Sequence, residues 1–291
     1  MARLTRSYVH GASTLPLIGE TIGAHLDGTA SRFAERPALV VRHQVIRWSY
    51  RELKERTDAL AAGFLALGLK PGERIGIWSP NNAEWVLTQF ATAKAGLVLV
   101  NINPAYRIYE LEYAINKVGC SALILAPSFK TSDYLGMIRS LAPEIDRSRA
   151  GHLDSHRLPT LRTVIRMGAE TTPGMLNFDE VAGRATAKEA HEITRLAGSL
   201  QFDDPINVQF TSGTTGNPKG ATLTHHNILN NGFFIGEAMR LSEEGRLCIP
   251  VPFYHCFGMV LGNLACVTHG ACMVIPSEGF DPLAVLEAVQ E

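Results

Sequence analysis

The chain has 291 residues, of which 46% are hydrophobic and 19% are charged, and its formal net charge at pH 7 is −1. This length allows one large domain or two smaller ones with a sizeable core, and the near-neutral charge argues against a large basic face for nucleic acid. The five cysteines form no CxxC pair, which favours reduced thiols over a disulfide framework. The first six residues carry two arginines with no apolar segment behind them, so no secretory signal is expected and the predicted location is cytoplasmic.

Strand-like and helix-like segments alternate in the first half of the chain. Leu53, Leu60 and Phe64 recur with helical spacing, and Gly68 follows as a stop signal. The patterns predict helices over residues 51–67, 82–94 and 108–117, and strands over residues 74–78, 97–101 and 121–125. This βαβα order predicts a layered α/β fold with a largely parallel sheet.

The polar segment 144–159 interrupts the alternation. Its His152, Asp154 and His156 could be drawn as a metal site from their H-x-D-x-H spacing. A metal site needs further ligands and a supporting shell of hydrogen bonds, so a solvated surface loop is the favoured interpretation.

Residues 211–220 form the most informative segment, because they combine three glycines, four hydroxyls and one lysine after an apolar strand-like stretch. Glycines allow backbone N–H groups to approach an anion, and hydroxyls and a lysine add donors and charge. The segment fits neither the P-loop pattern nor the G-x-G-x-x-G pattern of dinucleotide-binding folds. It predicts a loop that holds a polyphosphate, with a plain polar hairpin turn as the alternative.

Four elements are predicted after this loop. Thr224 can cap a helix that runs to about residue 239, with Ile228, Ile235 and Met239 on its buried side. A strand is expected over residues 246–250. A membrane span could be drawn over residues 257–275, but polar residues and glycines interrupt it, so a core helix followed by a buried strand is predicted.

The final predicted element is a helix that begins at Asp281 and Pro282. Its Leu283, Leu286 and Val289 are expected to face a core.

The ten residues 211–220 resemble the phosphate-binding motif of the AMP-forming adenylating enzymes. Three further segments resemble other motifs of that superfamily: residues 48–53 (WSYREL), 93–107 (from AKAG to NPAYR) and 252–258 (PFYHCFG). The flanks of the loop, residues 207–210 (NVQF) and 221–227 (ATLTHHN), are similar to fatty-acyl-CoA synthetases, and most of all to their medium-chain group. The resemblance therefore implies the N-terminal domain fold of adenylate-forming enzymes, with layered βαβ sheets.

The resemblance implies a reaction in two steps, in which a fatty acid and ATP give acyl-AMP and coenzyme A then gives acyl-CoA. ATP, Mg²⁺ and coenzyme A are the implied cofactors and co-substrates. The phosphate loop would grip the β- and γ-phosphates, and its implied binding residues are Thr211, Ser212, Gly213, Thr214, Thr215, Gly216, Asn217, Pro218 and Lys219. No particular hydroxyl is assigned to the metal.

His255 matches the histidine that this family places at the mouth of the acyl pocket, where it would orient the carboxylate and neutralise charge near the α-phosphate. A Cys–His nucleophile pair with Cys256 is the weaker interpretation, because sequence neighbours on a strand point to opposite faces. The hydrophobic residues around His255 either line an acyl tunnel or pack in the core: Phe253, Tyr254, Phe257, Met259 and Val260. His225 and His226 are expected in the first turn of the following helix, with no chemical role.

Members of the resembled family are much longer than this chain. Residues 1–291 are therefore expected to be an incomplete N-terminal AMP-binding domain, without the C-terminal half of that domain and without the small C-terminal domain that carries a catalytic lysine. The predicted function is fatty-acid–CoA ligation, and this chain alone is expected to show no turnover. The alternatives are an inactive remnant that at most binds nucleotide, or a ligase for aryl or other acids.

Overall fold

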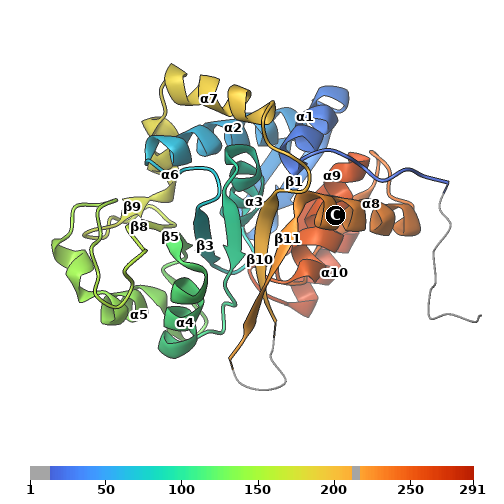
Figure 1. Ribbon diagram of the computed structural model, residues 1–291. Coiled ribbons are helices and arrows are strands. Elements are labelled where there is room, and N and C mark those ends of the chain that lie inside the picture. Colours follow the sequence, from blue (N-terminus) through green and yellow to red (C-terminus); the bar gives the residue numbers. More distant parts are fainter. Residues whose placement is uncertain (1–13, 212–216) are drawn as a thin grey trace, which may run out of the picture.

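The computed structural model describes residues 14–211 and 217–291, which contain a larger and a smaller sheet (Figure 1). The seven-stranded sheet has the order β11 (Lys219–Thr224), β10 (Pro205–Thr211), β4 (Val98–Asn101), β3 (Arg74–Trp78), β5 (Cys120–Leu125), β8 (Thr163–Arg166) and β9 (Leu176–Asn177). Its strands pair in parallel, except that β10 and β11 form an antiparallel hairpin.

The smaller sheet has four strands in the order β12 (Arg246–Cys248), β13 (Cys272–Ile275), β1 (Pro37–Val41) and β2 (Ile46–Ser49). A short hairpin joins β6 (Ser128–Phe129) to β7 (Ser132–Asp133). The helices are α1 (Ile22–Arg32), α2 (Tyr50–Ala66), α3 (Ala83–Ala95), α4 (Ile108–Val118), α5 (Tyr134–Leu141), α6 (Phe178–Val181), α7 (Ala187–Ala197), α8 (His225–Met239), α9 (Ala265–His269) and α10 (Pro282–Gln290). The predicted layered α/β fold is confirmed.

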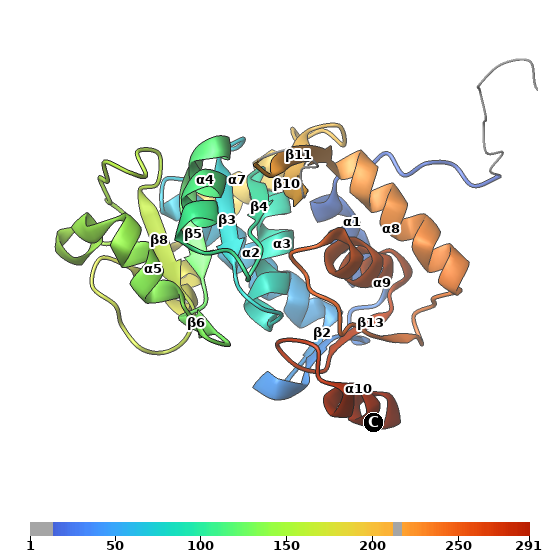
Figure 2. The same ribbon diagram turned by 90° about the horizontal axis from the view of Figure 1, so that it is seen from below.

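Local signals set the predicted helix boundaries. Ser49 and Glu52 form a capping box at the start of α2, and Asn82 caps α3. Helix α3 is buried on nearly every side and lies between the larger sheet and the α8–α9 pair (Figure 2). A helix in the middle layer has no solvent face, so its polar residues Thr88, Gln89 and Lys94 are buried together with its apolar ones.

The buried side of α8 differs from the prediction. Ile228 is buried as expected, but Ile235 is only half-buried and Met239 is 38% exposed. The packed face instead contains Gly232 and Gly236, which let the π-helical segment η4 (Phe257–Leu264) and α9 approach closely. A Cβ atom at Gly232 would lie 2.8 Å from that of Leu264, so small size decides the contact face here.

Helix α10 also differs from the prediction. Asp281 caps it as expected, accepting hydrogen bonds from the N–H groups of Leu283 and Ala284. The large residues Leu283, Leu286 and Val289 do not face a core, because they are 65%, 69% and 71% exposed. The half-buried stripe consists of the smaller residues Ala284, Val285 and Ala288, and Ala288 packs on strands β1 and β13.

Residues 257–275 form the predicted core helix and buried strand, with Gly270 at a φ of 71° between them. Within residues 14–211 and 217–291, no helix is long and apolar enough to cross a membrane. In the segment 144–159, His152, Asp154 and His156 are exposed and alternate with the buried Leu153 and Ser155.

Two glycines in helices provide a matched test of packing. Gly63 of α2 is buried, and a Cβ atom there would lie 2.7 Å from the carbonyl carbon of Val181, whereas Gly28 of α1 has open space around it. We expect Gly63→Ala to destabilise the fold by about 2 kcal/mol through overpacking. Gly28→Ala should stabilise it by roughly 0.5–1 kcal/mol through backbone entropy. Urea unfolding measures both, and equal stabilisation by the two alanines would contradict the packing of α2 on α6.

Candidate active site

The predicted phosphate loop connects β10 to β11 at the carboxyl edge of the larger sheet, which is the usual ligand edge of open α/β sheets (Figure 1). The antiparallel register pairs Thr211 with Lys219, and the Thr211 hydroxyl lies 3.4 Å from the Lys219 carbonyl oxygen. Thr211, Asn217 and Lys219 are exposed and Pro218 is half-buried. Of the predicted binding residues, Ser212, Gly213, Thr214, Thr215 and Gly216 lie outside the described residues.

Two tyrosines of α4 contact the two residues that directly precede β11. The Tyr109 hydroxyl lies 3.4 Å from Oδ1 of Asn217, and the Tyr113 hydroxyl donates to the carbonyl of Pro218 over 3.1 Å. Sequence reasoning missed these contacts. The available signal was a pair of tyrosines four residues apart on one helix face, of which Tyr109 is 65% exposed.

His255 lies in a tight turn before η4, so the strand geometry used in the argument against a Cys–His pair does not apply. Its N–H donates to the Pro252 carbonyl, and its carbonyl accepts the N–H of Gly258. The ring is exposed, and its Nδ1 accepts the N–H of Phe257 over 3.1 Å. With Nδ1 accepting, the neutral imidazole carries its proton on Nε2.

Cys256 does not form a nucleophile pair with His255. Its thiol lies 3.2 Å from Oε1 of Gln209, and burial raises the pKa of Cys256. All five cysteines are free, and burial raises the pKa of Cys120 to about 12 and that of Cys272 to about 11. These thiols are poor nucleophiles at neutral pH.

The hydrophobic residues around His255 divide into two groups. Phe253, Met259 and Val260 are at most 2% exposed and pack in the core. Phe257 is 50% exposed, and the half-buried Tyr254 lines a cavity of about 400 Å³. The same cavity is lined by Asn103 and by the cationic side chains Arg107 and Lys130. Two cations and one carboxylate, Glu278, therefore line this open space next to the His255 turn.

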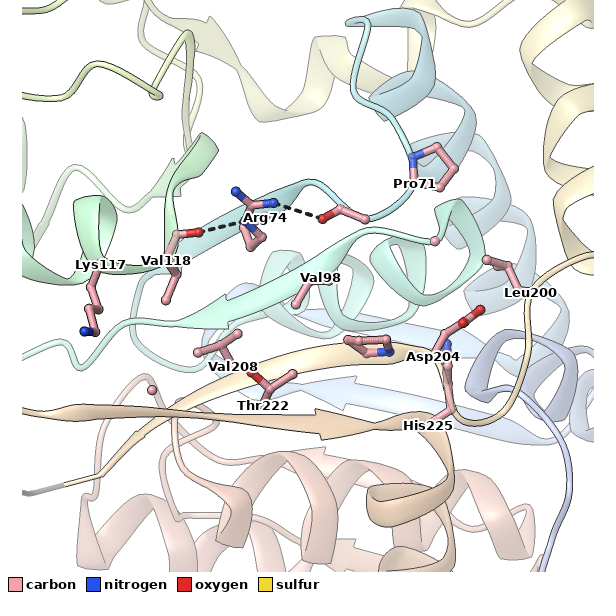
Figure 3. A pocket seen from close by; sticks show the side chains of 14 residues that line it. Pro71, Arg74, Val98, Lys117, Val118, Leu200, Asp204, Val208, Thr222 and His225 are labelled. Atoms are coloured by element: carbon pink, nitrogen blue, oxygen red, sulfur yellow. Dashed lines mark hydrogen bonds between the residues drawn. The ribbon is translucent and has the colours of Figure 1, made fainter.

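A larger cavity of about 600 Å³ lies near the amino ends of β3, β4 and β10 (Figure 3), and Gly220, the last residue of the predicted phosphate segment, is among its lining residues. Arg74, Val98, Asp204 and Thr222 are among the side chains that line it. Because ligands of open α/β sheets bind outside the carboxyl ends of the strands, this cavity is a weaker candidate for the active site.

His225 lines the same cavity and lies in the first turn of α8, as predicted for it and for His226. It is 0% exposed, and its Nδ1 accepts the N–H of Ile22 over 3.1 Å. Burial lowers the pKa of His225 to about 4, against a smaller opposing effect of the Asp204 carboxylate. His225 therefore joins α8 to α1 as a neutral ring.

The fold and the loop together define an adenylate-forming type of domain, and comparison with known proteins agrees. Residues 26–291 match the family described as "AMP-binding enzyme", and the chain belongs to that family. It is 47% identical over 290 residues to the medium-chain acyl-CoA ligase ACSF2, mitochondrial, of Bos taurus and 44% identical to that of Homo sapiens. Both alignments cover 97% of this chain and 47% of the relative, so the chain spans about half the length of these curated relatives.

Solved structures share the fold. The anthranilate CoA ligase AuaEII in complex with anthranoyl-AMP aligns with a TM-score of 0.75 at 23% identity, covering 89% of this chain and 45% of that one. ATP-bound MatB from Rhodopseudomonas palustris aligns with a TM-score of 0.74 at 23% identity, covering 94% of this chain and 48% of that one. At these identities the likeness supports the fold alone.

The lowered pKa of His225 predicts a pH effect on stability. The folded-state pKa of about 4 lies below the ordinary value of 6.5, so the contribution is complete above pH 6.5 and is lost as pH falls towards 4. Between pH 7.5 and pH 5, we expect wild type to lose about 2 kcal/mol more stability than His225→Asn, whose amide oxygen can still accept from Ile22. Urea unfolding at both pH values measures the difference. Equal losses in the two proteins would show that other groups carry the effect.

Proposed function

We propose that the parent enzyme of this chain activates a fatty acid with ATP to acyl-AMP and then transfers the acyl group to coenzyme A. One observation carries this proposal: Gln209, two residues before the phosphate loop, contacts Tyr254 and Cys256 on either side of His255. The two predicted elements of the site, far apart in sequence, thus meet at the carboxyl edge of the larger sheet.

In the proposed first step, a carboxylate oxygen attacks the α-phosphorus of ATP and pyrophosphate leaves. Residues 211–219 hold the leaving phosphates, and Lys219 neutralises part of their charge. His255 offers its Nε2–H to the oxygen atoms that gain charge near the α-phosphate. Catalysis in this scheme is mainly positioning and charge neutralisation.

The magnesium ion expected with ATP would be held mainly by phosphate oxygens, with loop hydroxyls as the nearest protein donors. When bound, it neutralises phosphate charge. Within the described ranges, no three His, Cys, Asp or Glu side chains gather as a metal site.

The cavity beside Tyr254 has two cationic lining residues, Arg107 and Lys130, against one carboxylate, Glu278, and this excess of positive charge supports an anionic substrate or co-substrate. A medium-chain fatty acid is the proposed acid, as the names of the relatives suggest. The ACSF2 relatives are named mitochondrial and do not support the predicted cytoplasmic location. That location stays a prediction, which rests on the free cysteines. An aryl acid is the alternative substrate, and the exchange assay described below distinguishes it from a fatty acid.

Lys219 provides a direct test of the phosphate loop. We expect Lys219→Met to raise the Kd for MgATP by about 10-fold, because a charge-assisted contact to phosphate is lost. Isothermal titration calorimetry on the 291-residue chain measures the Kd. Lys188→Met is the matched control, since Lys188 of α7 has an 89% exposed side chain remote from the loop. If the two variants bind MgATP equally well, the loop does not hold phosphate as proposed.

His255 tests the chemical step. In a full-length version that supplies the half found in the relatives, we expect His255→Ala to lower octanoate-dependent ATP–pyrophosphate exchange by about 100-fold, with the Kd for MgATP within about 2-fold of wild type. Exchange is measured with octanoate and with benzoate. A preference for benzoate would reject the fatty acid in favour of an aryl acid, and unchanged exchange in His255→Ala would reject the role of the histidine. The 291-residue chain alone should show no turnover in the same assay.

A further inference from the structure

A row of buried carboxamides crosses the sheet just before the phosphate loop. Asn207, Asn101 and Gln209 are 2%, 1% and 7% exposed. Nδ2 of Asn207 donates to Oδ1 of Asn101 over 2.9 Å, and Nδ2 of Asn101 lies 3.3 Å from Oε1 of Gln209. The parallel register sets Gln209 beside Asn101, and the period of two along β10 puts Asn207 on the same face as Gln209.

The row ends at the turn that carries His255. Nε2 of Gln209 donates to the carbonyl of Tyr254, and Oε1 of Gln209 accepts from the thiol of Cys256. Asn101 also donates to the Tyr254 carbonyl, over 3.2 Å. One carboxamide therefore contacts the residue before His255 and the residue after it.

Asn81 holds the start of the same turn. Its Nδ2 donates to the Val251 carbonyl and its Oδ1 accepts the N–H of Phe253, both over 2.8 Å. The turn is thus fixed at its start by Asn81 and at its centre by Gln209. The Phe257 N–H that donates to Nδ1 of His255 follows this centre directly in the chain.

We propose that Gln209 is a positioning residue, whose carboxamide sets the place and the ring tautomer of His255 relative to the phosphate loop. The proposal rests on the proposed function for what His255 does. Gln209 suits this task because it lies on the strand that continues directly into the loop, so the same rigid element carries the phosphate grip and the anchor of the histidine. A carboxamide can donate to one carbonyl and accept from one thiol at once, which an apolar side chain of the same length cannot do.

The ring tautomer of His255 gives a readout that loss of stability alone does not move. In wild type at pH 8.5, ¹⁵N–¹H spectra of the histidine rings should show His255 with its proton on Nε2, and the Phe257 amide should be protected from hydrogen exchange; His255→Ala assigns the signal. In Gln209→Met we expect a mixture of both tautomers and about 10-fold faster exchange of the Phe257 amide. Gln209→Glu keeps the shape and an acceptor but cannot donate to the Tyr254 carbonyl, so it should show the same changes.

Asn230→Leu is the matched control. Asn230 is a buried carboxamide on α8 that bonds to both backbone groups of Ile18, remote from His255 in the hydrogen-bond network. The Asn230→Leu variant should have a lower urea midpoint of unfolding and the same His255 tautomer as wild type. If Gln209→Met does not fold, Gln209→Glu carries the test.

A wild-type tautomer and wild-type Phe257 exchange in folded Gln209 variants would overturn the proposal. The same tautomer change in Asn230→Leu would also overturn it, because the effect would then follow stability alone. Neither measurement needs a ligand. Failure of the proposed function would show instead as unchanged MgATP affinity in Lys219→Met, so the two failures are distinguishable.

Discussion

The parallel pairing of β10 with β4 is the constraint on which the candidate site depends. Its register places Gln209 against the His255 turn and Asn207 against Asn101 on the same face, while Val208 faces the cavity on the opposite side of the strand. Because side chains alternate along a strand, a slip of one residue would exchange these two sets. Such a slip would bury apolar side chains against the His255 turn and would separate this turn from the predicted phosphate loop. One backbone ladder therefore positions both the strand that leads into the predicted phosphate loop and the Gln209 side chain that contacts the His255 turn.

Helix α3, which forms the middle layer, is held at its C-terminal end by charge rather than by amides. Lys94 of α3 has a 5% exposed side chain and bonds to Asp27 of α1 and Asp58 of α2. A buried ammonium is tolerated only with such partners, and their placement ties three helices to one point. Packing and charge thus fix the central layer, while the loops after the carboxyl ends of the strands remain open to ligands.

Much of the fold could be predicted because its determinants are local. Periodicity and caps gave the bounds of α2, α3, α4 and α8 to within one or two residues, and the loop motif gave the position of the β10–β11 hairpin. The face that a helix buries depends instead on its neighbours. Met239 and Leu286 are hydrophobic and correctly spaced, but glycines on α8 and alanines on α10 make the actual contacts. Periodicity therefore predicted these helices and placed Ile228 correctly, but it assigned other residues wrongly to their packed faces.

The surroundings of His255 could not be predicted, because no regular ladder holds them. Side-chain amides from separate elements support this segment: Asn81 follows β3, Gln209 lies in β10, and Gln89 of α3 donates to the Met259 carbonyl over 3.1 Å and accepts from Asn263 over 2.8 Å. The segment they hold includes η4, whose π-helical turns leave carbonyl groups in positions that an α-helix would not give.

Buried amides lose far more when unpaired than they gain when paired, so a network of this kind specifies one arrangement strongly. It also makes that arrangement depend on every strand and helix that contributes an amide. His255 is therefore positioned by the tertiary structure, whereas the prediction of a phosphate loop rests on ten consecutive residues. This difference explains why a motif alone predicts the loop, while the histidine needs the whole domain to acquire its place.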